Sequence, residues 1–159
     1  MISADYLTVK IESERLLLYP VSNEEMKLLI ENEKDDELKQ AYSEMLQMCM
    51  NEPENRIWHV LWNIELKDKP NIIIGNFSFK GINDGITEIG YGLKEGYCGK
   101  GYMTEALKRV CEWALTQESV KGVEAETSPE NDASQRVLLN AGFVAAGKNG
   151  AEGPRFMFE

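Results

Sequence analysis

The sequence predicts a single mixed α/β domain in which a mostly antiparallel sheet of about six or seven strands carries helices on both faces. Residues 56–93 alternate apolar and polar side chains, and the segments on either side repeat apolar residues every three or four positions. A glycine-rich loop joins the strand region to the later helices. The 159 residues, 43% of them hydrophobic and 28% charged, fit one globular domain over residues 1–159.

The N-terminal third predicts one strand and two helices. Residues 13–21 form a short first strand, and residues 22–33 form a helix that Ser22 or Asn23 caps. Residues 35–50 form an amphipathic helix that ends near Pro53. Its methionines fill the core or line an apolar pocket.

The middle of the chain predicts three strands in an antiparallel meander. Residues 56–66 place Trp58, Val60, Trp62, Ile64 and Leu66 on one face. Residues 71–81 form the second strand, and residues 85–93 form the third after an Asn-Asp-Gly turn. Short links between adjacent strands favour antiparallel pairing.

The C-terminal part alternates helices and strands. A helix begins near Gly99, a strand covers residues 121–128, and a helix covers residues 131–142 with Gly142 as its C-terminal cap. Residues 143–148 form a strand, and residues 154–159 form a final strand with Phe156 and Phe158 on one side.

Charge and composition narrow the class of protein. A formal charge of −10 disfavours nucleic acid and suits a cationic partner such as an amine or a basic polypeptide. Three cysteines without metal-type spacing and a single histidine argue against a metal site. No apolar run has membrane-spanning length, so we expect a cytoplasmic protein without a membrane partner. Among assemblies, the sequence leaves a homodimer open.

The stretch from Glu95 to Leu115 contains three glycines just before a strong helix, at Gly96, Gly99 and Gly101. Free N–H groups at a helix N-terminus form an anion site, and glycines let oxygen atoms approach closely. Lys100 can add a cation. The alternative is a tight turn that binds nothing. A nucleotide-triphosphate loop and a dinucleotide fingerprint both fail, because Gly101 and Thr104 stand where those motifs need other residues.

Two motifs in order resemble a known family. The run "EIGYGLKEGYCGKGYMTEAL" is followed about thirty residues later by "PENDASQRVLLNAGF". Together they resemble the GNAT acyl-CoA N-acyltransferases, and more narrowly the branch of ribosomal-protein N-terminal acetyltransferases (RimJ/RimL-like). The resemblance covers most of the chain, is strong over residues 88–143 and is vague over residues 35–55. It implies a GNAT-like sheet with acetyl-CoA as cosubstrate.

The resemblance also implies where acetyl-CoA binds. In that family a loop of the form (Arg/Gln)-x-x-Gly-x-(Gly/Ala) binds the pyrophosphate, and Gly96 departs from it by standing where Arg or Gln is usual. Glycines inside residues 88–93 suit a splayed strand whose free edge pairs with the pantetheine arm; packing against Trp58 or Trp62 is the alternative. The implied cofactor-binding residues are Tyr91, Gly92, Leu93, Cys98, Gly99, Lys100, Gly101, Tyr102, Met103, Asn131 and Ser134.

Two residues are candidates for the chemistry. Glu88 resembles the general base of several family members, and Ser134 faces the thioester sulfur by resemblance. Leu138 occupies the position of the tyrosine that many members use to protonate the leaving thiolate. Glu105 is expected to support or cap the loop, and Cys98 has no histidine nearby in sequence to activate it as a nucleophile.

The expected function is therefore an N-acetyltransferase that moves an acetyl group from acetyl-CoA to a primary amine by direct attack in a ternary complex. The acceptor could be a protein or peptide N-terminus, or a small amine such as an antibiotic or polyamine. The other readings are a non-catalytic acyl-CoA-binding module and an interaction domain with an empty loop. Residues 35–55, where the resemblance is poorest, would shape the acceptor pocket.

Overall fold

The computed structural model describes residues 9–158, and all its described strands form one eight-stranded sheet. The strands, in spatial order, are β1 (Ile11–Glu12), β2 (Leu16–Pro20), β3 (Leu61–Leu66), β4 (Ile73–Asn83), β5 (Ile86–Leu93), β6 (Gly122–Glu126), β8 (Pro154–Phe158) and β7 (Phe143–Asn149). Every neighbouring pair is antiparallel except β5 and β6, which are parallel. The predicted fold class is confirmed. The very short strand β1, which pairs with β2, adds one strand to the expected six or seven.

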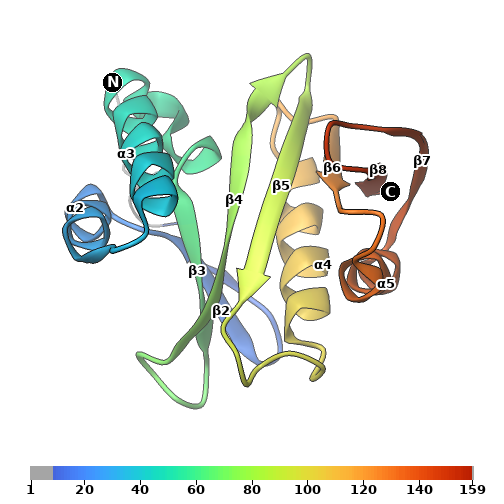
Figure 1. Ribbon diagram of the computed structural model, residues 1–159, viewed down its shortest axis with the longest axis horizontal. Coiled ribbons are helices and arrows are strands. Elements are labelled where there is room, and N and C mark those ends of the chain that lie inside the picture. Colours follow the sequence, from blue (N-terminus) through green and yellow to red (C-terminus); the bar gives the residue numbers. More distant parts are fainter. Residues whose placement is uncertain (1–8, 159) are drawn as a thin grey trace.

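The helices divide between the two halves of the sheet (Figure 1). Helices α2 (Asn23–Asn32) and α3 (Asp36–Asn51) lie beside β3, whereas α4 (Tyr102–Leu115) and α5 (Asp132–Ala141) lie by β5 and the C-terminal strands. The predicted caps are confirmed: the Ser22 hydroxyl accepts from Glu25 N–H, and Gly142 has a φ of 111° at the end of α5.

The core lies between the central strands and α4. Trp62 on β3 stacks on Phe77 of β4 with ring centroids 5.3 Å apart, and it meets Trp113 of α4 at 5.4 Å. Its indole N–H donates to the Ile57 carbonyl, so the ring is buried without an unpaired donor. The neighbouring residue Leu61 points to the other face and contributes to a groove beneath α3. The two faces of the sheet therefore carry different helices.

One predicted strand starts too early. Residues 53–58 form a 3₁₀ helix, η1 (Pro53–Trp58), and β3 begins only at Leu61. Pro53 explains the difference, because its fixed φ and missing N–H suit the first turn of a helix. Trp58 is buried as predicted, but from the end of η1 and not from a strand.

Most of the predicted elements lie within residues 9–158, which the structure describes. Residues 1–8 and Glu159, which the single-domain prediction and the final predicted strand include, lie outside the described residues. Among residues 9–158, no helix has the length and apolar character needed to cross a membrane. The same residues contain no group of three or more histidine, cysteine, aspartate or glutamate side chains that could hold a metal ion.

Candidate active site

Strands β5 and β6 separate in the middle of the sheet. They are paired only from Ile86–Gly122 to Glu88–Glu124, while β5 stays paired with β4 as far as Leu93. The backbone of β5 from Ile89 to Leu93 therefore has no strand partner on the β6 side among residues 9–158. An edge of this kind presents free N–H and C=O groups to any ligand that can pair with it.

The glycine-rich loop follows β5 directly and leads into α4. Gly96, Gly99 and Gly101 have φ values of 96°, 78° and 81°, a backbone conformation that side chains with a Cβ rarely adopt. A Cβ at Gly96 or Gly99 would meet no atom within 4 Å. A hydrogen-bonded turn at Cys98 and Gly99 engages the N–H of Lys100. Within the described chain, no backbone or side-chain acceptor is recorded for the N–H groups of residues 98, 99 and 101–104. These donors are free to bind an anion.

The loop, the free edge of β5 and the start of α5 enclose one cleft of about 510 Å³. Ten of the eleven residues predicted to bind the cofactor line it, namely Tyr91, Gly92, Leu93, Cys98, Gly99, Gly101, Tyr102, Met103, Asn131 and Ser134. Lys100 is the exception; its side chain is not part of the lining. Residues that lie about forty positions apart in the chain, and that the sequence analysis assigned to one site, therefore line the same cleft.

Other lining residues were missed by the sequence reasoning. Ala133, Arg136, Val137 and Asn140 of α5 line the cleft together with Ser134. They recur at intervals of three and four, so the helical period could have identified this face of α5. Arg136 is the cation that the cleft contains, in place of the predicted Lys100.

Glu105 supports the loop from one turn inside α4. Its carboxylate accepts hydrogen bonds from the Arg15 backbone N–H at 2.8 Å and from Arg15 Nε at 2.7 Å, and from the Ser13 hydroxyl. Arg15 in turn donates to the Lys100 carbonyl at 3.1 Å, and its guanidinium lies 4.2 Å from the centre of the Tyr102 ring. Burial raises the pKa of Glu105, but these hydrogen bonds and the charge of Arg15 outweigh burial and leave the pKa below its ordinary value.

Tyr91 and Ser134 meet across the cleft. The Tyr91 phenol oxygen is 2.6 Å from Ser134 Oγ, and the Asn131 side chain accepts from the Ser134 backbone N–H at 3.0 Å. Burial raises the pKa of Tyr91 despite the hydrogen bond to Ser134, so its phenol stays protonated at neutral pH. Leu138 is fully buried in the core and does not line the cleft.

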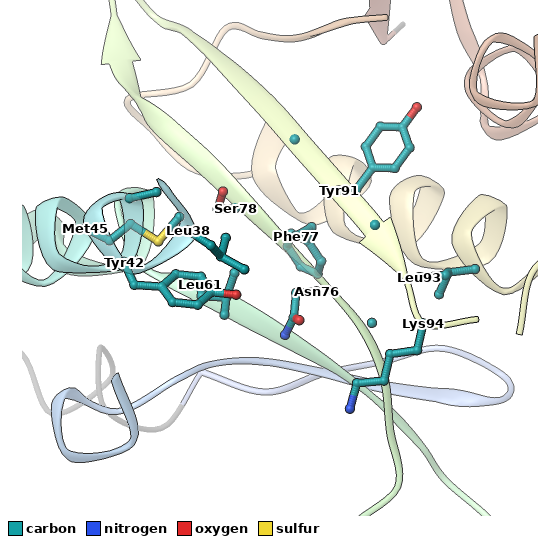
Figure 2. Close-up of a pocket in the computed structure, with 14 residues that line it drawn as sticks. Leu38, Tyr42, Met45, Leu61, Asn76, Phe77, Ser78, Tyr91, Leu93 and Lys94 are labelled. Carbon is teal, nitrogen blue, oxygen red and sulfur yellow. The ribbon is translucent and has the colours of Figure 1, made fainter. Parts of the chain in front are cut away.

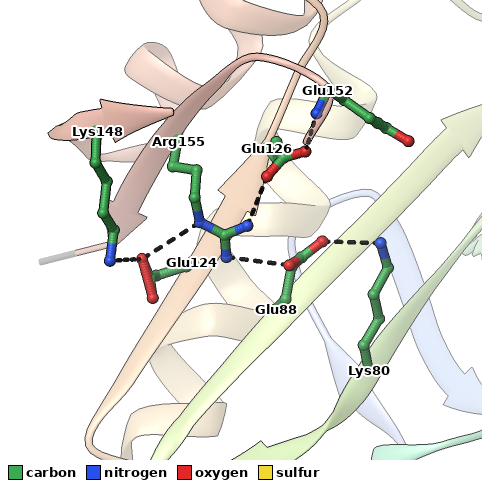
Figure 3. A network of polar contacts seen from close by, with 7 residues as sticks. All are labelled: Lys80, Glu88, Glu124, Glu126, Lys148, Glu152 and Arg155. Carbon is green, nitrogen blue, oxygen red and sulfur yellow. Dashed lines mark hydrogen bonds and ion pairs between the residues drawn. The ribbon is translucent and has the colours of Figure 1, made fainter. Parts of the chain in front are cut away.

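Glu88 lies at the last pair of β5 and β6 and is held in an ionic network (Figure 3). Its carboxylate accepts from Lys80 Nζ at 2.8 Å and lies 3.0 Å from Arg155 Nη2. Burial raises the pKa of Glu88, but the two cations more than compensate, and the pKa is lowered. Glu88 lines neither the cleft nor the groove described next. Its role as a general base stays a prediction.

A groove on the other side of β5 lies beneath α3 (Figure 2). It shares Tyr91, Gly92 and Leu93 with the cleft, so the two hollows meet at β5. Residues 38–45 of α3 form its apolar wall, in the region that the sequence analysis expected to shape an acceptor pocket. His59 lies outside it, with Nε2 3.4 Å from a Glu52 carboxylate oxygen.

The glycines in β5 serve this groove. A Cβ at Gly92 would meet no atom within 4 Å, which excludes packing against Trp58 or Trp62 as the reason for the glycine. An irregularity in pairing lies on the partner strand, where the β4–β5 register shifts between Phe79 and Ile82. A Cβ at Gly75 of β4 would come within 2.5 Å of the Gly92 carbonyl oxygen, so the close backbone approach is between β4 and β5 themselves.

The family model and the curated relatives that match this chain agree on one family of proteins. Residues 12–144 match the model of the acetyltransferase (GNAT) domain. The chain is 35% identical over 85 residues to the uncharacterized N-acetyltransferase YjdG of Bacillus subtilis, an alignment that covers 52% of this chain and 50% of that protein. The chain thus spans about half the length of the curated relatives it matches.

Solved structures share the fold at low identity. The ribosomal-protein-S5-alanine acetyltransferase of Vibrio fischeri superposes with a TM-score of 0.71 at 19% identity, over 94% of each chain. A spermidine N-acetyltransferase mutant of Vibrio cholerae superposes with a TM-score of 0.67 at 14% identity, over 92% of this chain and 94% of that one. Their different acceptors mean that the fold alone does not identify the acceptor.

The contacts of Glu105 predict a pH-dependent contribution to stability. Replacing Glu105 by Gln should lower the free energy of unfolding at pH 7 by about 1.5–3 kcal/mol, because hydrogen bonds to a charged group are lost. A carboxylate with a lowered folded pKa stabilises the fold above its unfolded pKa of about 4.3, and this contribution disappears as the pH falls through the folded pKa. The difference in the free energy of unfolding between Glu105→Gln and wild type should therefore become smaller below about pH 4.

Denaturant unfolding at pH 7 and pH 3.5 measures this difference. Glu112→Gln on the same helix is the matched control, since Glu112 is exposed, and it should change stability by less than about 0.5 kcal/mol. Equal effects of the two substitutions at pH 7 would show that the Glu105 contacts do not stabilise the loop.

Proposed function

The chain belongs to the GNAT acetyltransferase family, and we propose that it transfers an acetyl group from acetyl-CoA to a primary amine. The amine attacks directly while both substrates are bound, and the proposed acceptor is the N-terminus of a protein or peptide. The observation that carries the proposal is the set of N–H groups without a recorded acceptor at residues 98, 99 and 101–104, all of which belong to residues that line the same cleft as the free edge of β5. This arrangement suits a ligand with a diphosphate at one end and amide groups along its arm.

The loop residues fit the diphosphate of coenzyme A. The absent side chains of Gly96 and Gly99 leave open space in front of the free N–H groups, and the N-terminus of α4 adds a partial positive charge. Gly96 removes the Arg or Gln side chain that the family loop usually has, and Arg136 offers a guanidinium from α5 instead. Arg15 and Glu105 hold the loop in shape from outside the cleft.

Bound acetyl-CoA supplies a thioester, and we assign to Ser134 the hydrogen bond that stabilises the leaving thiolate. Either oxygen of the Tyr91–Ser134 pair, 2.6 Å apart, could donate, and we assign the donor role to Tyr91 because a phenol is more acidic than an alcohol. The Ser134 hydroxyl hydrogen is then free to point into the cleft. Tyr91 acts in this proposal as a positioning residue, and the pair takes the place of the tyrosine that Leu138 replaces.

The base proposed for the amine is Glu88, acting through water because its carboxylate lines neither hollow. Its lowered pKa keeps it ionised at neutral pH, as a proton acceptor must be, but also makes it a weak base. A weak base removes a proton more easily from an amine with a low pKa. Glu88 can therefore assist an amine that is partly neutral at pH 7 better than an amine that is almost fully protonated.

Release of free thiol tests the proposed function. With acetyl-CoA and a mixture of peptides with free N-termini, the protein should release coenzyme A at a rate that depends on the acceptor. Addition of acetyl-CoA alone should raise the melting temperature, because a ligand that binds only the folded state stabilises it. A rise in melting temperature without acceptor-dependent thiol release would instead indicate a non-catalytic acyl-CoA-binding module.

Two glycines allow a matched test of the loop. Gly99 and Gly147 both have positive φ values, 78° and 75°, and a Cβ at either would meet no atom within 4 Å. Alanine at either position should cost about 1–2 kcal/mol of stability through backbone strain. Only Gly99→Ala should weaken acetyl-CoA binding, by about tenfold or more, or about 1.4 kcal/mol. Equal affinity of the two variants, measured by calorimetry, would contradict diphosphate binding at the loop.

A double-mutant cycle tests the Tyr91–Ser134 pair. We expect Ser134→Ala to lower kcat by about 10–100-fold and Tyr91→Phe by about 10-fold, with little change in the KM for acetyl-CoA. Because Tyr91 acts through Ser134, the double variant should be no slower than Ser134→Ala alone. Tyr19→Phe, which removes a phenol bonded to Glu65 outside both hollows, should retain full kcat. Multiplying effects in the double variant would refute the positioning role.

A further inference from the structure

The groove beneath α3 carries information about the acceptor. On the basis of the acetyl transfer proposed above, we propose that the acceptor is the α-amine of a peptide whose first side chain is large and apolar, and that Lys94 excludes amines with a second positive charge nearby. The support comes from the apolar lining of the groove, from Lys94 as the one charged residue recorded in the inner pocket, and from the lack of a carboxylate among the described residues that line that pocket.

The groove consists of two adjoining pockets that share Tyr42, Leu61, Asn76 and Lys94. The inner pocket, of about 390 Å³, reaches β5 at residues 90–93, where it meets the acetyl-CoA cleft. The outer pocket, of about 430 Å³, continues along α2. An amine at β5 would therefore have the rest of its molecule along both pockets, which is the shape of an extended chain.

The inner pocket suits a large apolar side chain. Figure 2 shows Leu38, Tyr42, Met45 and Leu61 gathered on one side of the pocket. Gly90 and Gly92 of β5 also line the pocket and contribute only main chain. Apolar burial in such a pocket contributes to binding in proportion to the area removed from water. Tyr91 points away from this wall, toward α5, and leaves the pocket to the acceptor.

The charge of the inner pocket is opposite to that of the whole protein. The chain has a formal charge of −10, but no carboxylate lines the inner pocket, and Lys94 is its one charged residue among those described. In the outer pocket, Glu25 and Lys94 are the two charged residues recorded. A polyamine would place a second ammonium group near Lys94 without a carboxylate beside it in the inner pocket. An unpaired like charge of this kind acts against a wrong substrate.

The lack of a carboxylate in the described lining of the inner pocket also favours an α-amine over a side-chain amine as the acceptor. With no carboxylate lining the inner pocket, the acceptor must supply much of its own neutral form. An α-amine has a pKa of about 7.7–8.0, whereas a side-chain amine has a pKa of about 10.4. At pH 7.5 about a third of an α-amine but only about 0.1% of a side-chain amine is neutral, a difference of a few hundred-fold.

The outer pocket favours a peptide over a free amino acid. Leu28 and Leu29 line it and are 56% and 37% exposed. A free amino acid would end near Lys94 and leave both leucines uncovered, whereas a second or third apolar residue of a peptide would cover them. Large exposed apolar side chains that line a hollow are typical of binding surfaces.

The test compares four acceptors in the thiol-release assay at pH 7.5. They are a peptide amide that begins Leu-Ala-Ala, the same peptide with Lys at positions 2 and 3, free leucine, and spermidine. We expect kcat/KM to be highest for the apolar peptide, at least tenfold higher than for the lysine-containing peptide or leucine, and at least a hundredfold higher than for spermidine.

Lys94→Glu changes the charge at the groove, and Lys69→Glu in the exposed β3–β4 connection is the matched control. Lys94→Glu should raise kcat/KM for spermidine at least tenfold and narrow its disadvantage relative to the apolar peptide. Lys69→Glu should leave both values unchanged. The relative preference among acceptors is the readout, so a general loss of activity in the variant does not simulate the effect.

Three outcomes would overturn the inference. Spermidine used by the wild type as well as the apolar peptide would refute the role of charge, and free leucine used equally well would refute the peptide. An unchanged preference in Lys94→Glu would refute the role of Lys94. If acetyl-CoA binds and none of the acceptors releases thiol, the proposed function fails and the inference falls with it. If another acceptor is turned over as fast as the apolar peptide, the inference alone is overturned.

Discussion

Strands β5 and β6 share three residue pairs and then separate, and the cleft at the free edge of β5 depends on that separation. The pivot is an unfavourable place in electrostatic terms, because the carboxylates of Glu88 and Glu124 stand in register on neighbouring strands. Arg155 of β8 compensates: its guanidinium lies 3.0 Å from Glu88 and 3.6 Å from Glu124, and it binds Glu126 at 2.7 Å (Figure 3). One cation thus holds three acidic residues from two strands at the point where the sheet opens, which gives Glu88 a structural task besides the proposed chemical one.

Sequence reasoning recovered the elements whose signals are local. Caps, glycine positions and periodicity predicted α2 through Ser22 and the end of α5 through Gly142, as the structure confirms. It misplaced the start of β3, because alternation from Trp58 to Leu66 looks the same whether the first residues are extended or form a 3₁₀ turn after Pro53. Strand β1 has two residues, too few to show any period, and its existence depends on pairing with β2.

In the candidate site, too, the residues in contiguous motifs could be predicted from the sequence, whereas the contacts between distant segments could not. The cleft residues could be named from two motifs because each motif is contiguous in sequence and the fold brings the two together. Contacts between distant segments were beyond the sequence. Arg15 is ninety positions before Glu105 and had no signal of its own, and the Tyr91–Ser134 pair depends on how β5 leans toward α5. Lys100 does not line the cleft, because the position of a loop residue does not determine the direction of its side chain, and its cofactor-binding role stays a prediction.

The alternation of β5 explains how one strand can serve two substrates. Side chains of successive residues point to opposite faces, so Tyr91 reaches the cleft and Ser134 while Gly90 and Gly92 leave the opposite face bare. A Cβ at Gly92 would meet no atom within 4 Å, so packing in the core does not require the glycine, and its absent side chain leaves the main chain of β5 uncovered. Lys94 ends this series as the first charged side chain after the bare backbone. A ligand that approaches β5 through the groove therefore contacts main chain and apolar wall in the inner pocket, where Lys94 is the one charged residue recorded in the lining. Glu25 joins Lys94 in the outer pocket, so the positive character is confined to the part of the path next to β5.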